Sequence, residues 1–321
     1  MSNKDIITTA KSTIQLEADA IKKLLDFIDG NFEKAVDTIA FSKGRLVVSG
    51  IGKSAIIAQK IVATFNSTGT PALFMHAADA IHGDLGMIQK EDIIIIISKS
   101  GDSPEIKVLA TLIKNFGNTL IGMVGNTASF LASQCDIMLN TTVDQEACPN
   151  NLAPTTSTTA QMVMGDALAV CLMEVKGFGT IDFARFHPGG MLGKKLYLRV
   201  MDLSSQNEHP AVFPNATINQ VIVEMTRKRL GTTAVVNNDN TVAGIITDGD
   251  LRRMLEKTTV FSALQAQDIM SSRPETINAA MLAADALEIM KSKNISQLIV
   301  IENGFYAGII HLHDLIKEGI V

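Results

Sequence analysis

Three short segments rich in serine, threonine and glycine hold the residues best suited to chemistry. They are Ser49-Gly50-Ile51-Gly52-Lys53-Ser54, Ser98-Lys99-Ser100-Gly101-Asp102-Ser103 and Thr155-Thr156-Ser157-Thr158-Thr159. Each is expected at the carboxyl end of a strand and the start of a helix, where free N–H groups and hydroxyls suit a phosphate dianion. Serine and threonine are also routine helix N-caps, so a purely structural role remains open for each segment.

Charged and imidazole side chains near these segments could act on a ligand anchored by its phosphate. His82 and His187 lie in turn-forming sequences, and Glu146 directly precedes the third segment. A carboxylate there could face the ligand, and a solvated loop glutamate is an equally good interpretation. The full set of candidates is Lys53, His76, His82, Glu105, Glu146 and His187.

The first segment partly matches two nucleotide-binding motifs but lacks residues that each of them requires. The first segment ends in Gly-Lys-Ser, as a Walker P-loop does, yet Val47 stands where that motif requires glycine. A single Gly-X-Gly, with no acidic residue at the end of the next strand, also falls short of the dinucleotide fingerprint. Kinase and dehydrogenase functions are therefore disfavoured.

The elements that must position these residues alternate between short apolar runs and helical patterns. Apolar strands without alternation predict a doubly wound, mostly parallel α/β sheet of five strands covered on both faces. Residues 4–29 and 31–42 are expected to form two N-terminal helices, the first with an apolar stripe that includes Ile14, Ile21, Leu25 and Ile28. The expected strands are 45–50, 72–76, 92–98, 119–125 and 136–143, and the helices between and after them are 53–66, 103–116, 127–134 and 157–176.

The last third of the chain repeats itself. Residues 215–251 can be laid over 278–315, with Gly244 aligned on Gly308. Each copy predicts helix, strand, turn, strand and helix, and two copies favour a paired α+β module over a solenoid. We therefore expect a first domain at 1–199 and a second at 200–321, with copies at about 200–264 and 265–321.

Composition limits the classes of function. The chain has 321 residues, 46% of them hydrophobic, and a net charge of −5, which argues against nucleic acid as a partner. No apolar run is long enough to span a membrane, and the N-terminus lacks the apolar region of a signal peptide. Three widely spaced cysteines suit a reducing compartment. The expectation is a cytoplasmic enzyme.

Four ordered segments, 49–86, 97–106, 145–169 and 186–196, resemble the sugar-isomerase (SIS) domain of the D-arabinose-5-phosphate isomerases. The repeat pair resembles the tandem CBS domains that follow it in that family. The resemblance implies an intramolecular oxidoreductase that interconverts D-ribulose 5-phosphate and D-arabinose 5-phosphate through an enediol. It also implies a homotetramer with shared active sites that requires no cofactor and feeds 3-deoxy-D-manno-octulosonate synthesis for lipopolysaccharide or capsule. An isomerase of another sugar phosphate and a non-catalytic sugar-phosphate sensor remain the alternatives.

The resemblance puts Lys53, Glu105, Glu146 and His187 at the family's catalytic positions, and the chemistry of an enediol assigns each a role. Glu146 would be the C–H base and His187 the proton shuttle at oxygen, and Lys53 would stabilise the enediolate. Glu105 would orient the sugar hydroxyls or Lys53, although the two carboxylates could exchange roles. His82 matches a conserved-motif histidine, and His76 a position linked to zinc, which we expect to inhibit. The residues expected to line the substrate or hold its phosphate are Ser49, Ser54, Gly69, Thr70, His82, Ser98, Lys99, Ser100, Ser103, Thr156 and Ser157.

Small departures from the family pattern leave this chemistry in place. The second segment has Lys99 where the family usually has asparagine, which makes the expected phosphate pocket more basic. In the repeats, Thr247, Asp250 and Asp314 match positions that contact nucleotides, whereas His311 replaces the second threonine. A nucleotide or the pathway's CMP-sugar is therefore an expected effector.

Overall fold

A computed structural model describes residues 6–258 and 260–320 of the chain. Contacts divide it into two compact units, one ending at Phe186 and one beginning at His187. No helix in the described ranges is long and apolar enough to cross a bilayer.

The first unit is built on one parallel sheet of five strands in the order β2-β1-β3-β4-β5. Their bounds agree with the expected strands to within a few residues, and the predicted doubly wound α/β fold is confirmed. The strands are β1 Leu46–Gly50, β2 Ala72–His76, β3 Ile93–Ser98, β4 Thr119–Val124 and β5 Ile137–Asn140.

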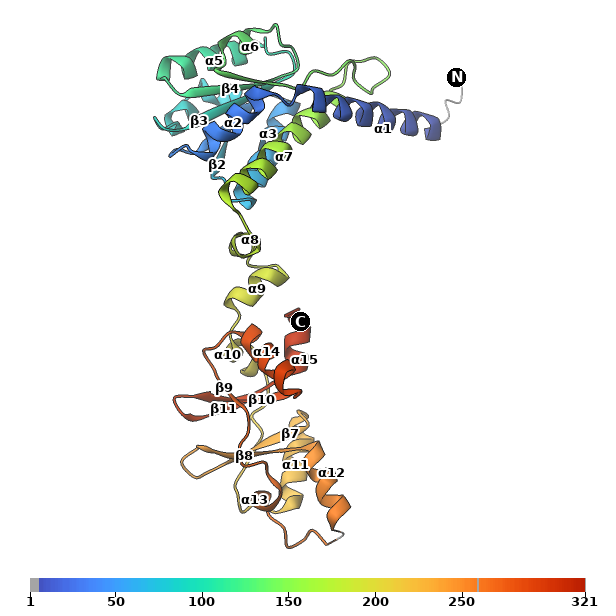
Figure 1. Cartoon of the computed structure of the whole chain (residues 1–321), viewed down its shortest axis with the longest axis vertical. Helices are drawn as coiled ribbons and strands as arrows, with labels where there is room; N and C mark the ends of the chain where they lie inside the picture. The colour runs from blue at the N-terminus through green and yellow to red at the C-terminus, as the bar shows by residue number, and fades with distance from the viewer. Residues whose placement is uncertain (1–5, 259, 321) are drawn as a thin grey trace. The chain divides into compact units, whose positions relative to one another are not determined.

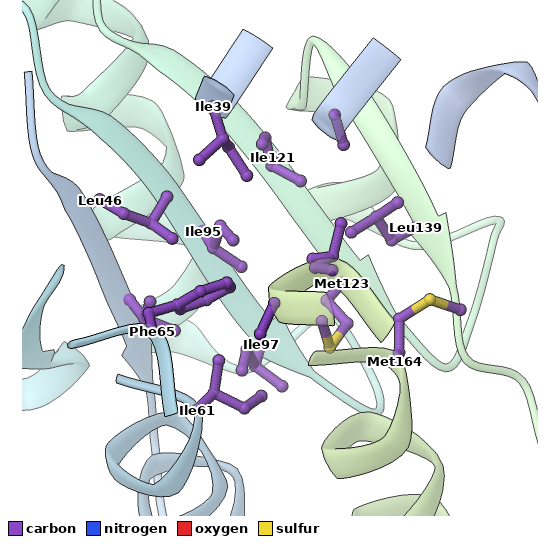
Figure 2. Packing of buried hydrophobic residues seen from close by; sticks show 14 of the residues in the cluster. Ile39, Leu46, Ile61, Phe65, Ile95, Ile97, Ile121, Met123, Leu139 and Met164 are labelled. Atoms are coloured by element: carbon purple, nitrogen blue, oxygen red, sulfur yellow. The ribbon is translucent and has the colours of Figure 1, made fainter. Parts of the chain in front are cut away.

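Helices cover both faces of this sheet (Figure 1). On one face the cluster in Figure 2 joins Ile95 and Ile97 of β3 to residues of α2, α3 and α7. Ile94 and Ile96 point to the other face, where they pack with α5 and α6. Both faces are buried, which explains the unbroken isoleucine run. The helices of this unit are α1 Ile6–Lys23, η1 Leu24–Phe27, α2 Gly30–Ala40, α3 Lys53–Ser67, α4 Ala77–Ala80, η2 Asp84–Met87, α5 Pro104–Phe116, α6 Phe130–Gln134, α7 Thr156–Lys176 and α8 Thr180–Phe186.

The first helix differs from its expectation. The single helix expected at 4–29 is an α-helix to Lys23 followed by a 3₁₀ turn. Asp29 then caps α2 by accepting from the N–H groups of Asn31 and Phe32. No described residue of α1 is buried, and Ile14 is 70% exposed. Within one protomer the apolar stripe is therefore only partly covered, since Ile21 is half-buried whereas Leu25 and Ile28 are exposed like Ile14.

The second unit contains two three-stranded sheets, β6-β7-β8 and β11-β10-β9. The predicted order of helix, strand, turn, strand and helix is confirmed in each copy. The elements are α9 Met191–Tyr197, α10 Val200–Ser204, β6 Ala211–Val212, α11 Ile218–Lys228, β7 Thr232–Val236, β8 Val242–Thr247, α12 Asp248–Lys257, α13 Ala266–Ile269, β9 Thr276–Asn278, α14 Ala283–Lys293, β10 Gln297–Glu302, β11 Phe305–His311 and α15 Leu312–Lys317.

The two copies exchange their leading helices. Val200 and Leu203 of α10 are buried in the core of the second copy. Ala266 and Ile269 of α13 pack instead in the core of the first. A boundary drawn along the sequence therefore separates each leading helix from the copy that it completes.

The first unit also ends earlier than the expected boundary at residue 199. The helix α9 belongs to the second unit, because Met191 lies against Gly319 and Lys194 forms an ion pair with Glu318 at 2.7 Å. His187, which the sequence analysis placed in the first domain, begins this second unit.

Candidate active site

The strand order places a crossover at the carboxyl edge of the sheet. The chain leaves β1 through α3 to β2 on one side, then crosses to β3 on the other side of β1. In doubly wound sheets of this order, the crevice between the ends of β1 and β3 is the usual ligand site. The first two hydroxyl-rich segments follow these two strands.

Two polar contacts bring the third segment to the same place. The hydroxyl of Ser54 in the first turn of α3 donates to Oε1 of the buried Gln161 on α7, at 3.2 Å. Lys99 in the second segment lies 2.7 Å from Oε1 of Glu146, the residue that precedes the third segment. The three segments therefore form one cluster. Gln161 was missed, because only the hydroxyls of its segment were considered.

The second segment is a tight loop with its own internal hydrogen bonds. Oγ of Ser98 accepts from the N–H of Gly101 at 3.0 Å, and Oγ of Ser100 accepts from the N–H of Asp102 at 3.4 Å. Gly101 has a φ of +68°, and a Cβ there would lie 2.1 Å from Oγ of Ser129. Only glycine fits this turn, which shapes the loop ahead of α5.

Several hydroxyls around the cluster are buried with no hydrogen-bond partner in the described part of the chain. They belong to Ser49, Ser103, Thr141 and Thr156. Buried polar atoms are normally paired, so this concentration indicates groups prepared for a ligand. Three of the four were predicted from the sequence. Thr141 was not, since it follows β5 outside the hydroxyl-rich segments.

Glu146 is the most heavily bonded residue of the cluster. Its side chain is 0% exposed. Oε2 accepts from the N–H groups of Thr155 and Ser157, at 2.8 and 3.1 Å, and from the hydroxyl of Thr155 at 3.3 Å. Oε1 accepts from the hydroxyl of Ser157 and pairs with Lys99. The carboxylate thereby caps the N-terminus of α7, where negative charge is favourable.

These contacts fix the ionisation of Glu146. Burial alone would raise the pKa of the carboxyl group, but hydrogen bonds from Lys99, Ser157 and Thr155 lower it from its ordinary 4.5 to about 2. Glu146 is therefore a buried anion at neutral pH. Lys99 supplies the opposite charge and has a side chain that is 45% exposed.

Lys53 and Glu105 are placed differently from Glu146. Lys53 is the first residue of α3, and Glu105 lies in the first turn of α5, after Ser103 and Pro104. Neither side chain has a hydrogen bond or ion pair among the residues that the structure describes. Both groups therefore start helices at the carboxyl edge with their charges available to a ligand.

The histidines near β2 do not form a complete metal site. His76 ends β2, and its Nδ1 accepts from the N–H of Ala78 at 3.3 Å. Asp79 is 3.9 Å from the same nitrogen, and His82 is exposed. Within residues 6–258 and 260–320 there is no group of three or more histidine, cysteine, aspartate or glutamate side chains able to hold a metal.

Gly69 and Thr70 are not brought to this site within one protomer. They precede β2 at the amino edge, and a strand of the length of Ala72–His76 spans about 16 Å. The ring of Phe178 lies where a Cβ of Gly69 would be, and Thr70 is buried with its hydroxyl 2.9 Å from Nζ of Lys176. Their substrate-lining role is not met here, because packing at the start of β2 occupies both residues.

His187 lies in the turn before α9, where its carbonyl accepts from the N–H of Gly190 at 3.1 Å. A Cβ at Gly193 would lie 2.3 Å from this carbonyl oxygen, so the glycines of the motif allow the turn to close. Residues 187–193 thus form a structural turn of the second unit and also carry a candidate catalytic imidazole.

The candidate nucleotide contacts in the repeats already form capping boxes. Thr247 caps α12, and its hydroxyl donates to Asp250 at 2.6 Å. In the second copy Asp314 accepts from the N–H of His311 at 2.8 Å and from Asn207 at 2.7 Å. His311 therefore replaces threonine at the cap without loss of the box. A bound nucleotide would have to displace or share these bonds.

Comparison with protein families matches a different type of domain to each of the two units. The description "SIS domain" matches residues 39–171, and "CBS domain" matches residues 200–257 and 266–320. The second unit thus begins before its first CBS match.

Curated relatives match almost the whole chain. Arabinose 5-phosphate isomerase KdsD of Pseudomonas aeruginosa is 45% identical over 99% of this chain and 98% of its own. KdsD of Escherichia coli K12 is 41% identical over 99% of this chain and 97% of its own. A solved structure of an E. coli CFT073 protein in complex with arabinose 5-phosphate is 40% identical, with a TM-score of 0.56, and covers 59% of this chain and 100% of its own.

Proposed function

This chain belongs to the arabinose 5-phosphate isomerase family, and we propose that it interconverts D-ribulose 5-phosphate and D-arabinose 5-phosphate. The observation that carries the assignment is the cluster of three hydroxyl-rich segments at the carboxyl edge, joined by the contacts of Ser54 with Gln161 and of Lys99 with Glu146. It combines a phosphate-binding surface with two carboxylates and two lysines.

The substrate phosphate is assigned to the second and third segments. Their N–H groups lie at the starts of α5 and α7, where helix termini favour anions. The unpaired hydroxyls of Ser103 and Thr156 would donate to phosphate oxygens, and Lys99 would supply a positive charge. Ser98, Ser100 and Ser157 complete the set, although each already has a bond within the protein.

The reaction moves one proton between two carbons. A carboxylate takes a proton from C1 of ribulose 5-phosphate, the C–H electrons form a C1–C2 double bond, and O2 gains negative charge. O2 is then protonated, the hydroxyl on C1 loses its proton to form the aldehyde, and C2 receives the proton. The site therefore needs a carbon base, a group that moves protons at oxygen, and a charge that stabilises the enediolate.

We assign Glu146 as the carbon base, Lys53 to the enediolate and Glu105 to the orientation of sugar hydroxyls. His187 would move protons between the oxygens. The unpaired state of Lys53 and Glu105 supports contacts with substrate, as does the ionised state of Glu146. A folded Glu146→Gln protein that stays active would show that the two carboxylates exchange these roles.

The assay that tests the function follows purified protein with ribulose 5-phosphate by NMR. We expect arabinose 5-phosphate to appear, and fructose 6-phosphate and ribose 5-phosphate to be converted much more slowly. Rapid conversion of another sugar phosphate alone would assign a different isomerase. Binding of sugar phosphate without conversion of any would make the protein a sensor.

We propose further that the second unit binds a nucleotide or the CMP ester of the pathway's sugar acid. CBS domains are the module matched there, and the first copy keeps Thr247 and Asp250 together at one helix start. Calorimetry with AMP, ATP and the CMP-sugar, on the full chain and on residues 1–200, tests this. Absence of binding to the full chain at millimolar concentration would contradict it.

We propose a cytoplasmic homotetramer in which subunits share active sites. The exposed isoleucines of α1, which one protomer leaves uncovered, support association. Mixing an inactive Lys53→Met protein with an inactive His187→Ala protein, under conditions that exchange subunits, would restore activity if His187 acts in the active site of another subunit. Light scattering gives the number of subunits.

A further inference from the structure

The carboxylate of Glu146 is saturated in the arrangement that the structure shows. Two carboxylate oxygens offer about four lone-pair directions. Oε2 accepts from both N–H groups and one hydroxyl, and Oε1 accepts from Ser157 and Lys99. In this arrangement no lone pair is left to receive a proton from carbon.

Lys99 differs from the other donors in its freedom to leave. Thr155 and Ser157 are held by the start of α7, next to the loop that carries Glu146. Lys99 comes from a different segment, its side chain is 45% exposed, and a flexible four-carbon stem carries its charge. A Cβ at Gly125 would lie 3.2 Å from Cγ of Lys99, so the absence of a side chain there leaves room for the stem.

A second partner for this ammonium group would arrive with the substrate. Lys99 belongs to the loop of residues 98–103 assigned to the phosphate, and the same loop carries the unpaired hydroxyl of Ser103. A phosphate monoester carries nearly two negative charges and three acceptor oxygens at neutral pH. It therefore competes well with a carboxylate that keeps its hydrogen bonds to Thr155 and Ser157 after the lysine departs.

We propose that Lys99 changes partners during turnover: it blocks Oε1 of Glu146 in the empty site and moves to the phosphate of the bound sugar. This inference rests on the proposed function and deepens it. The move exposes a lone pair of Oε1 toward the carbon acid and removes the positive charge that makes the carboxylate a weak base. The phosphate then acts as the signal that activates the base, and sugars without phosphate meet a blocked carboxylate.

The test separates the substrate into two pieces. D-Erythrulose lacks the terminal phosphomethyl group of ribulose 5-phosphate, and phosphite dianion replaces that group. NMR in D₂O follows exchange of the C1 protons of D-erythrulose, which reports proton abstraction directly. With the full-length wild-type protein we expect slow exchange that phosphite accelerates at least about 10-fold, since a remote group can contribute to the reaction at carbon.

Lys99→Met distinguishes a blocking lysine from a simple phosphate ligand. We expect exchange without phosphite to be at least about 10-fold faster than in wild type, and phosphite to add little, because the lone pair is already exposed. Lys99→Arg should restore both the slow proton exchange without phosphite and its acceleration by phosphite. Lys107→Met is the matched control, since Lys107 pairs with Asp102 of the same loop at 3.2 Å without contact to Glu146, and it should behave as wild type.

Unchanged or slower phosphite-free exchange in Lys99→Met would overturn the inference and leave Lys99 as a phosphate ligand. A crystal structure of the full chain with inorganic phosphate gives a second, activity-independent decision. We expect phosphate at the loop of residues 98–103 with Lys99 turned toward it. A structure in which Lys99 is still bonded to Glu146, or in which the loop holds no phosphate, would refute the proposed change of partner. Failure of the proposed function is seen separately, as absence of conversion of ribulose 5-phosphate by the wild-type protein.

Discussion

Arg45 encloses the carboxylate of Asp92 at the amino edge of the sheet. Its backbone N–H and Nε donate to Oδ1 at 2.9 and 3.2 Å, and Nη2 donates to Oδ2 at 2.7 Å. The Asp92 side chain is 0% exposed, and the N–H of Gln89 supplies a further bond at 2.9 Å. The pair ties the start of β1 to the start of β3, at the edge opposite the proposed active site.

Asp92→Asn should destabilise the protein without altering its chemistry. Removal of one partner from a buried pair costs about 3–5 kcal/mol, and the partial exposure of Arg45 places the expected loss nearer 2–3 kcal/mol. Denaturant unfolding measures the loss, with Asp166→Asn, in a surface pair with Lys60, as the control expected to lose less than about 1 kcal/mol. An equal loss in both variants would contradict the special role of the buried pair.

The same pair gives a pH dependence. Burial alone would raise the pKa of Asp92, but Arg45 and the backbone bonds hold it below its ordinary value. The folded state therefore binds this proton less readily than the unfolded chain. The contribution to stability is complete above the unfolded pKa of about 3.9 and is lost as pH falls through the folded pKa. Asp92→Asn should reduce the loss of stability below about pH 4, as unfolding at several pH values would show.

Glu146→Gln should reduce turnover by about 100-fold or more while sugar phosphate still binds. A positioned base contributes about 10²- to 10⁴-fold. The glutamine amide also places an N–H₂ group where Glu146 accepts hydrogen bonds from Ser157 and Thr155, which could lower stability. The melting temperature of the variant is therefore compared with that of the wild type. Asp144→Asn in the same loop, where Asp144 pairs with Lys23 at the surface, is the control expected to retain full activity. A folded Glu146→Gln protein with more than a tenth of wild-type turnover would transfer the base role to Glu105.

The sheet and its loops were predictable because they depend on local pattern. The isoleucine run of β3 has no alternation, and burial on both faces leaves no other arrangement for it. The hydroxyl-rich segments that follow β1 and β3 then lie next to each other, because the two strands are neighbours in the sheet. The partner of Glu146 was not predictable, because Lys99 is distant in sequence and reaches it only through the side-by-side placement of two loops.

Other features depend on contacts that sequence does not encode locally. Thr70 has the type expected of a ligand contact, yet Lys176 and the start of β2 bury it. Thr141 shows no motif at all and becomes a candidate only through its unpaired hydroxyl in the folded structure. The apolar stripe of α1 predicted a helix correctly, but periodicity does not state which surface covers it.

Chelation should leave the enzyme active, and added zinc should inhibit it. The described residues contain no three-ligand metal group, whereas His76 with Asp79 gives zinc a partial site close to the end of β2. Activity after EDTA treatment and during zinc titration tests this, and His76→Gln should weaken inhibition. Loss of activity on chelation, restored by zinc, would make the metal catalytic and contradict the prediction.

Residues 1–200 should fold and isomerise without the repeats. The sheet and the three hydroxyl-rich segments lie before this point, with a core separate from those of the second unit. Truncation removes Glu318 and α14, the partners of α9, so we expect lower solubility. Circular dichroism and the isomerase assay decide the matter, with the full chain as reference. A folded but inactive fragment would show that the repeats complete the site, for instance by holding the turn of His187.

Gly101→Ala should impair substrate affinity more than stability. Alanine at this position would have to adopt the left-handed backbone of the turn, which costs about 1 kcal/mol in a non-glycine residue. Its methyl carbon would also lie 2.1 Å from Oγ of Ser129. Relief of this clash must move the loop of residues 98–103 and its phosphate donors, so KM should rise at least about 10-fold, equivalent to about 1.4 kcal/mol of binding. Gly117→Ala is the matched control, because its φ of +78° carries the same backbone cost with no atom within 4 Å of the added carbon. Equal kinetic effects in the two variants would mean that the cost is general strain and that the loop does not hold the phosphate.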